Sequence, residues 1–154
     1  RSHVVSSAAM KFEFTNLHFE GEIRTKWDTL LRIVGDFTLR IRDRAIYTEV
    51  DFCLVEFAVA LANWLAIATD LGPDFIYTSL ESDIEGLVRF TRIDRGVWQI
   101  SAAHEDHEAR DTFTTADLKS AALAYIRELR SQLPSSVDIL QFVDDADARQ
   151  LLEG

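Results

Sequence analysis

The sequence predicts an α+β fold, with an antiparallel sheet of about five strands packed on a long central apolar helix and a C-terminal amphipathic helix. Two observations lead to this prediction. Residues 53–69 form an almost unbroken apolar run, CLVEFAVALANWLAIAT, which is longer than the usual strand of about 3–10 residues. On both sides of this run, short segments alternate apolar with polar side chains, which is the pattern of half-buried strands.

The first part of the chain predicts a strand, a short helix and a second strand. Residues 11–19 alternate as in FEF at 12–14, which indicates a strand. Residues 24–34 predict an amphipathic helix because four apolar side chains follow helical spacing: Trp27, Leu30, Leu31 and Val34. After Gly35, residues 36–43 alternate again, and the polar face of this strand carries Thr38, Arg40 and Arg42.

The apolar run at 53–69 is interpreted as a buried helix. Thr48 and Asp51 resemble a capping box before it, and Gly72-Pro73 is a typical helix end. A membrane span is disfavoured, because Glu56 and Asn63 interrupt a run that is shorter than the roughly 20 apolar residues needed to cross a bilayer.

The second half of the chain predicts an antiparallel meander followed by helices. Strands are expected at 74–79, 86–94 and 97–103, with a tight turn at 94–96 and a short edge strand at 110–114. A capping-box pattern at Thr114 begins a helix that ends before Pro134, and its apolar face is formed by Leu118, Ala121, Ala122, Tyr125, Ile126 and Leu129.

The domain is expected to occupy residues 10–154, with 135–154 as an extra helix or an acidic tail. Residues 1–9 are interpreted as sequence from upstream of the domain, since they lack the apolar region of a signal peptide and Met10 resembles a natural start. The one cysteine, Cys53, excludes an internal disulfide and favours a reducing, cytoplasmic location. Within the apolar run it is expected to be a small buried side chain.

The charge balance narrows the class of partner. The chain has 26 acidic and 16 basic residues, a formal net charge of −10. This charge argues against binding to nucleic acid or to an anionic membrane and favours a basic partner.

Catalytic signatures are scarce. No nucleophile elbow, phosphate-binding loop, dinucleotide fingerprint or paired C-x-x-C is present. The densest titratable cluster is HEDHE at 104–108, in which His104 and His107 could present two nitrogen atoms to a metal. A solvated connector is the favoured interpretation, so no metal and no cofactor are expected. A small metal-dependent hydrolase that uses this loop remains an alternative.

Two further groups of polar residues are candidate sites. Glu56, Asn63 and Asp70 are seven residues apart and would form a polar stripe on the helix, facing a cleft, touching solvent or held by an arginine. If two strands align, an arginine-bearing sheet face could add to this cleft and bind carboxylate or phosphate, through Thr38, Arg40, Arg42, Arg89 and Thr91. An ordinary solvated face is the favoured interpretation.

Acidic residues gather in three patches: Glu81, Asp83 and Glu85; Glu105, Asp106 and Glu108; and Asp144, Asp145 and Asp147. Such patches usually keep a protein soluble. The alternative is that one of them faces a basic partner and steers its association.

The order of elements and the motif E-F-x-x-x-L-x-x-W-L, with an F-x-Y strand and a tryptophan-bearing strand, resembles a group of small uncharacterised bacterial α+β proteins. The residues concerned are Glu56, Phe57, Leu61, Trp64, Leu65, Phe75, Tyr77 and Trp98. Some members of this group look like immunity proteins of polymorphic toxin systems. The resemblance covers residues 11–133 and brings no catalytic residues with it.

Together with the acidic charge, the resemblance favours a non-catalytic binding protein. The leading hypothesis is a cytoplasmic immunity protein that covers the basic active-site region of a cognate toxin with an acidic surface. The metal-dependent hydrolase is one alternative, and a structural or dimerising subunit is another.

Overall fold

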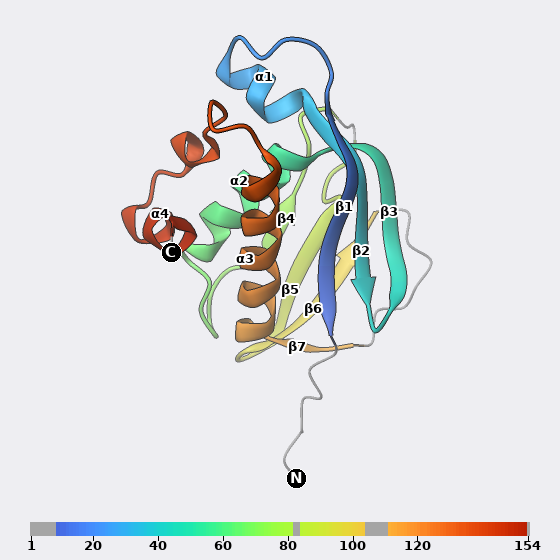
Figure 1. The fold of residues 1–154 in the computed structure, drawn as a ribbon. Helices are drawn as coiled ribbons and strands as arrows, with labels where there is room; N and C mark the ends of the chain where they lie inside the picture. The colour runs from blue at the N-terminus through green and yellow to red at the C-terminus, as the bar shows by residue number, and fades with distance from the viewer. Residues whose placement is uncertain (1–8, 82–83, 104–110, 154) are drawn as a thin grey trace.

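The alternating residues at the start of the chain form a strand in the computed structural model, which describes residues 9–81, 84–103 and 111–153. β1 (Met10–Phe19) pairs with β2 (Ile33–Ile41), and β2 pairs with β3 (Arg44–Cys53), all antiparallel. Along β2 the apolar side chains Phe37, Leu39 and Ile41 are buried. These three strands form one side of the molecule (Figure 1).

The second half of the chain supplies a separate antiparallel sheet. Its strands are β4 (Phe75–Tyr77), β5 (Val88–Asp94), β6 (Val97–Ala102) and β7 (Phe113–Thr114), in that spatial order. The turn predicted at 94–96 joins β5 to β6, and Gly96 has a φ of 66°, a left-handed conformation that glycine adopts without steric cost.

The prediction of one sheet of about five strands is therefore wrong, because the strands divide into sheets of three and four. The strand β3 was missed, since its apolar residues do not alternate regularly. The pairing of β2 with β3 shifts register between Gly35 and Phe37, and Val50 and Asp51 lie in the resulting bulge. A bulge inserts an unpaired residue and thereby breaks the period of two on which sequence patterns depend.

The first helix is shorter than predicted. α1 (Lys26–Leu31) begins with a capping box between Thr25 and Asp28, whereas Ile33 and Val34 belong to β2 and are 0% and 1% exposed. Trp27, expected on the buried face of this helix, is 62% exposed. Strand pairing on both sides of β2 thus outweighs the helical spacing.

The central helix also differs in its bounds from the prediction. α2 (Leu54–Leu65) has Cys53 at its N-cap without a side-chain cap bond, so the capping box expected from Thr48 and Asp51 is wrong. The helix ends before the expected Thr69, because the backbone turns to bring Asp70 to the second sheet. There the carbonyl oxygen of Asp70 accepts a hydrogen bond from the amide of Gly96 at 2.8 Å. No helix among the described residues has the length and apolar character needed to cross a bilayer.

The C-terminal amphipathic helix is confirmed. α3 (Thr115–Gln132) begins with the capping box of Thr114 and Asp117, and all six residues of its predicted apolar face are buried. The chain then forms a 3₁₀ turn, η1 (Ile139–Phe142), and a short helix, α4 (Ala146–Glu153). The residues after Pro134 are therefore helical in two pieces.

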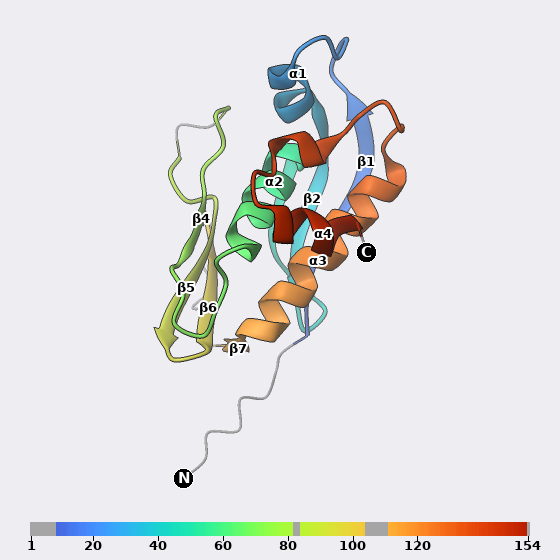
Figure 2. The same ribbon diagram turned by 90° about the vertical axis from the view of Figure 1, so that its left-hand side faces the viewer.

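The two sheets and the helices share one aromatic core, and α2 lies between the second sheet and α3 in the view of Figure 2. Phe57 of α2 is fully buried, and its ring centroid lies 5.2 Å from Phe37 of the first sheet, 5.1 Å from Tyr77 of the second and 5.3 Å from Tyr125 of α3. Such edge-on aromatic pairs each contribute about 0.5–1.5 kcal/mol beyond simple burial. Phe57 therefore packs against both sheets and α3 at once.

Candidate functional site

A groove of about 370 Å³ lies where α1, the end of β3 and the segment after β4 meet. We call it the acidic groove and define it by its lining residues: Glu20, Trp27, Asp28, Leu31, Arg32, Val34, Asp51, Cys53 and Glu81. A smaller cavity of about 90 Å³ is lined in part by the same Asp51, Cys53 and Glu81, so the two hollows are adjacent.

The wall formed by α1 is held in place by local hydrogen bonds. Asp28 accepts hydrogen bonds from the backbone amides of Arg24 and Thr25, and its other carboxylate oxygen lies 2.8 Å from Nε of Arg32. The Arg24 amide, followed by the Arg32 guanidinium, lowers the pKa of Asp28 to about 2. The charge of Arg32 is therefore already matched within the wall.

Three carboxylates of the acidic groove lack such a match. Glu20, Asp51 and Glu81 are exposed, and none forms an ion pair with a lysine or arginine in the part of the chain that the structure describes. Like charges gathered in a hollow focus their field outward. The groove therefore attracts a cation or a cationic surface.

Large apolar side chains stand exposed beside these carboxylates. Trp27 lines the groove at 62% exposure, while Val50 and Leu80, the chain neighbours of Asp51 and Glu81, are 71% and 67% exposed. Single exposed apolar residues are common, but tryptophan is normally well buried. Tryptophan is enriched in protein interfaces whereas Glu and Asp are depleted there, so the exposed tryptophan, and not the acids, is the feature typical of such a surface.

The floor of the groove contains the one cysteine. Cys53 is buried, and its thiol donates a long hydrogen bond to the carbonyl oxygen of Leu31 at 3.7 Å. Burial, followed by the charge of Glu56, raises the pKa of the thiol to about 11. The expectation of a buried, unreactive cysteine agrees with this environment.

Glu56 lies beneath the floor of the groove. It binds the segment after β4, which forms the wall opposite α1. One of its carboxylate oxygens accepts a hydrogen bond from the hydroxyl of Tyr77 at 2.8 Å, and the other accepts from the amide of Leu80 at 3.1 Å. The Ser79 hydroxyl accepts a further bond from the amide of Glu81 at 3.1 Å. Glu56 is thus a positioning residue for the segment that carries Glu81, and among the described residues no arginine forms an ion pair with it.

The five residues of the predicted cleft do not come together. Glu56 is buried, whereas Asn63 is exposed on α2. Arg40 pairs with Glu13 at 3.2 Å and Arg42 pairs with Asp111 at 3.2 Å. Arg40 lies on β2 and Arg89 on β5, which belong to different sheets, and Arg42 lies in the turn between β2 and β3. The shared face of Thr38, Arg40, Arg42, Arg89 and Thr91 therefore does not form.

The three predicted acidic patches differ in where they lie and in whether the structure describes them. Of the first, Glu81 lies in the acidic groove and Glu85 is exposed, while Asp83 lies outside the described residues. The second patch, Glu105, Asp106 and Glu108, and the candidate ligands His104 and His107 also lie outside the described residues.

The third acidic patch lies at the start of α4. Asp145 accepts a hydrogen bond from the amide of Ala148 at 2.9 Å and thereby caps the helix. Asp144 and Asp147 are exposed beside it, and Asp147 lies in the first helical turn, where a negative charge interacts well with the helix dipole. Helix capping accounts for part of this patch without a partner.

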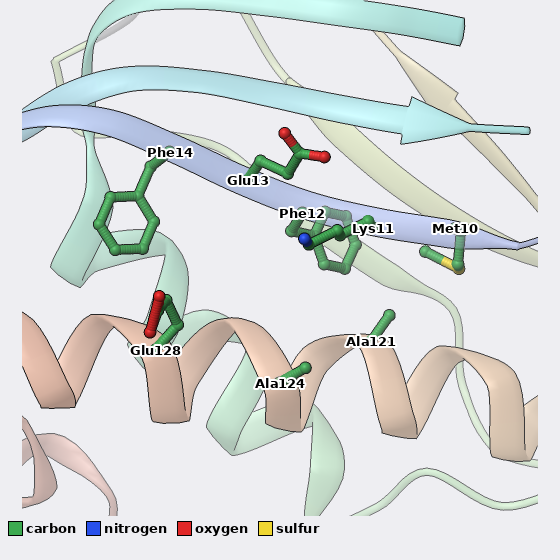
Figure 3. Close-up of a pocket in the computed structure, with 8 residues that line it drawn as sticks. All are labelled: Met10, Lys11, Phe12, Glu13, Phe14, Ala121, Ala124 and Glu128. Atoms are coloured by element: carbon green, nitrogen blue, oxygen red, sulfur yellow. The ribbon is translucent and has the colours of Figure 1, made fainter. Parts of the chain in front are cut away.

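A second hollow, of about 320 Å³, lies between β1 and α3 (Figure 3). The helix presents the small side chains Ala121 and Ala124 to the strand, which leaves space beside Phe12 and Phe14. Its rim carries charges of both signs, Lys11, Glu13 and Glu128. This hollow follows from the size of the alanines and contains no group of catalytic side chains.

Sequence reasoning found one residue of the acidic groove, Glu81, and missed the others that define its character. Glu20 and Asp51 are separated in the chain and meet only because β1 and β3 both flank β2. For Trp27 the sequence contains a signal, since Thr25 and Asp28 form a capping box that places Trp27 in the first turn of the helix. First-turn residues of such a short helix are often exposed.

The structure is an α+β domain with an acidic, tryptophan-bearing hollow and, among the described residues, no paired nucleophile and base. The chain belongs to the family described as Domain of unknown function (DUF7878), whose model matches residues 10–135. No curated protein and no solved structure matches the chain. The matched range begins with β1 and ends just after α3, so it contains every residue of the acidic groove and leaves out α4.

Proposed function

We propose that this protein is a non-catalytic binding protein whose acidic groove receives a basic surface of a partner protein. The partner is a bacterial toxin, and the protein acts as its cytoplasmic immunity protein by covering the toxin's basic active-site region. The observation that carries the proposal is the meeting of three unmatched carboxylates with an exposed tryptophan in one hollow.

The geometry of the groove suits a protein partner. Binding hot spots are enriched in tryptophan, tyrosine and arginine and lie in pockets that become dry on binding. Trp27 offers such an anchor, and Val50 and Leu80 extend the apolar area beside it. Glu20, Asp51 and Glu81 would match lysine or arginine side chains of the partner and raise its association rate.

Catalysis is less well supported by the described residues. Cys53 is buried with a raised pKa, and both carboxylate oxygens of Glu56 already accept hydrogen bonds. His18 is the only histidine of the described region, and it lies near carboxylates and no nucleophile. The hydrolase alternative depends on His104 and His107 and stays an alternative.

The toxin as partner rests on the net charge of −10 and on the resemblance of the element order and core motif to immunity proteins. An inhibitor of this kind needs a rigid surface of complementary charge and no chemistry of its own. The aromatic core and the Glu56 hydrogen bonds provide that rigidity directly beneath the groove.

The test is coexpression with the product of the adjacent gene, since an immunity gene normally lies beside its toxin gene. Growth should be rescued, and the two proteins should copurify with an affinity that falls as salt is raised. A neighbour that is harmless to growth, or that does not copurify, would contradict the toxin proposal.

Matched variants locate the contact. Trp27→Ala should weaken binding by about thirtyfold or more, which corresponds to a hot spot of about 2 kcal/mol. Leu71→Ala, at a residue that is 61% exposed and outside the groove, should leave binding unchanged. Glu81→Lys should weaken binding whereas Asp147→Lys should not, and the reverse order would assign the contact to the acidic tail.

A further inference from the structure

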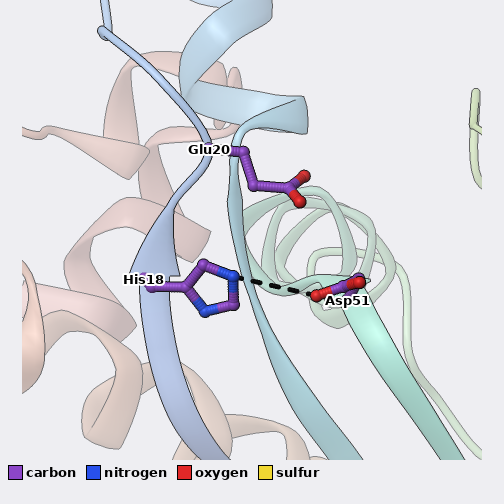
Figure 4. A group of neighbouring side chains, drawn as sticks. All are labelled: His18, Glu20 and Asp51. Atoms are coloured by element: carbon purple, nitrogen blue, oxygen red, sulfur yellow. Dashed lines mark ion pairs between the residues drawn. The ribbon is translucent and has the colours of Figure 1, made fainter.

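A histidine and two carboxylates converge at one end of the first sheet (Figure 4). His18 lies near the end of β1, Glu20 directly follows that strand, and Asp51 lies in β3. One ring nitrogen of His18 and one carboxylate oxygen each of Glu20 and Asp51 lie within 4.8 Å of one another. These residue types are the usual nitrogen and oxygen ligands of divalent metal ions.

The backbone conformation of β1 and β3 brings the side chains of His18, Glu20 and Asp51 together at this end of the first sheet. The pairing of β1 with β2 is irregular between Thr15 and His18, and Asp51 lies in the bulge of β3, so both strands are bent at the same level. Glu20 is fixed at its backbone, since its amide donates to the carbonyl oxygen of Arg32 at 2.8 Å. The convergence is therefore built by the sheet as well as by the side chains.

The imidazole of His18 is oriented as in a metal ligand. Its Nδ1 lies 2.7 Å from the carbonyl oxygen of Asn16, and because a carbonyl can only accept, Nδ1 carries the proton. A backbone carbonyl at this ring nitrogen is the usual outer partner of metal-binding histidines. The other nitrogen, Nε2, therefore faces the carboxylates.

Nε2 of His18 lies 3.7 Å from a carboxylate oxygen of Asp51, which is longer than a hydrogen bond. In the neutral ring both atoms are acceptors, so they repel unless a proton or a cation lies between them. Ligands at about 2.1 Å from a tetrahedral ion are about 3.4 Å apart, so the observed separation is a few tenths of an ångström from that geometry.

We propose that His18, Glu20 and Asp51 bind a divalent transition-metal ion, with Zn²⁺ as the best match. One imidazole and two carboxylates suit Zn²⁺, whereas Mg²⁺ and Ca²⁺ prefer oxygen ligands alone. The side chains of His18 and Asp51 are 41% and 63% exposed, so they can close on an ion without moving the core. The site leaves a fourth position for water. It shares Glu20 and Asp51 with the acidic groove, so a bound ion would offset two of the three carboxylates assigned to the partner, and titration with Zn²⁺ tests the site without any partner.

The test is titration of the full chain with Zn²⁺ alone, after removal of metal with a chelator, by calorimetry. We expect one Zn²⁺ per chain and a shift of the side-chain ¹⁵N resonance of Nε2 of His18. His18→Ala and Asp51→Asn should each weaken Zn²⁺ binding by more than about tenfold. Removing a residue that only hydrogen-bonds to a metal ligand already costs about tenfold, and removing a ligand should cost more. Circular dichroism checks that the variants fold.

The matched control is the double variant His104→Ala/His107→Ala, which removes the other candidate ligands. It should keep the same stoichiometry and affinity as the wild type, and Mg²⁺ at equal concentration should not displace Zn²⁺. The proposal is overturned if Zn²⁺ does not bind in a one-to-one ratio. It is also overturned if the His104/His107 variant loses binding while His18→Ala keeps it.

Discussion

The three tyrosines of the chain provide a graded test of what holds the core together. The hydroxyl of Tyr77 donates to the buried carboxylate of Glu56 at 2.8 Å. The hydroxyl of Tyr125 donates to the backbone carbonyl of Leu54 at 2.7 Å, and that of Tyr47 donates to Glu49 at 3.4 Å near the surface. Burial raises the pKa of all three hydroxyls above the usual value, so all three are protonated donors at neutral pH.

Changing each tyrosine to phenylalanine removes one hydroxyl and leaves the ring in place. Tyr77→Phe should lower the free energy of unfolding by about 1.5–3 kcal/mol, because it strips a donor from a buried charged acceptor. Tyr125→Phe should cost about 0.5–1.5 kcal/mol, because the helix still supplies a partner to the Leu54 carbonyl. Tyr47→Phe, with a long and half-exposed bond, should cost less than about 0.5 kcal/mol.

The measurement is urea unfolding followed by tryptophan fluorescence and by far-UV circular dichroism, with the same slope expected for all variants. A double-mutant cycle of Tyr77→Phe with Glu56→Gln should show a coupling of about 1 kcal/mol, because the two groups contact each other directly. If Tyr77→Phe were no more costly than Tyr47→Phe, the role assigned to Glu56 as the anchor of the groove wall would be refuted.

Further predictions concern other buried or capping groups. The pKa of Asp28 is lowered to about 2, so the contribution of this carboxylate to stability is full above about pH 4 and is lost as the pH falls through 2. An NMR titration of Asp28 with a midpoint near 4 would contradict the hydrogen bonds described for the α1 wall. Cys53, with a pKa raised to about 11, should be alkylated at pH 8 at least about a hundredfold more slowly in the folded protein than in urea, as measured by mass spectrometry. Thr115→Val should destabilise the protein by about 1–3 kcal/mol, since it leaves the buried Nε1 of Trp98 without its acceptor at 2.8 Å, whereas Thr115→Ser should cost less.

The elements with strong local signals were predicted well. The helix α3 was found from Thr114 to the residues before Pro134, because a capping box, a continuous apolar face and a proline all act within a few residues of one another. The hairpin of β5 and β6 was found for the same reason, since its turn at Gly96 is recognisable without the rest of the fold.

The errors arose where distant contacts override local pattern. The end of β3 resembles a helix start in the sequence, because its bulge at Asp51 interrupts the alternation of a strand. The helix α2 ends at Leu65, before the expected Thr69, because Asp70 makes contacts outside the helix. The carboxylate of Asp70 accepts a hydrogen bond from the hydroxyl of Thr115 at 2.7 Å. Neither partner could be inferred from neighbouring residues in the chain.

Charge, hydrophobic content and the residue types available for chemistry can be known from composition, because they are sums over residues. The acidic groove cannot be known from composition, since Glu20, Asp51 and Glu81 come from three separate segments of the chain. These segments meet only when β1 and β3 flank β2 and when Glu56 binds the segment after β4. A sequence specifies such a meeting through pairing register and burial across the whole core, and these are long-range properties that no local window contains.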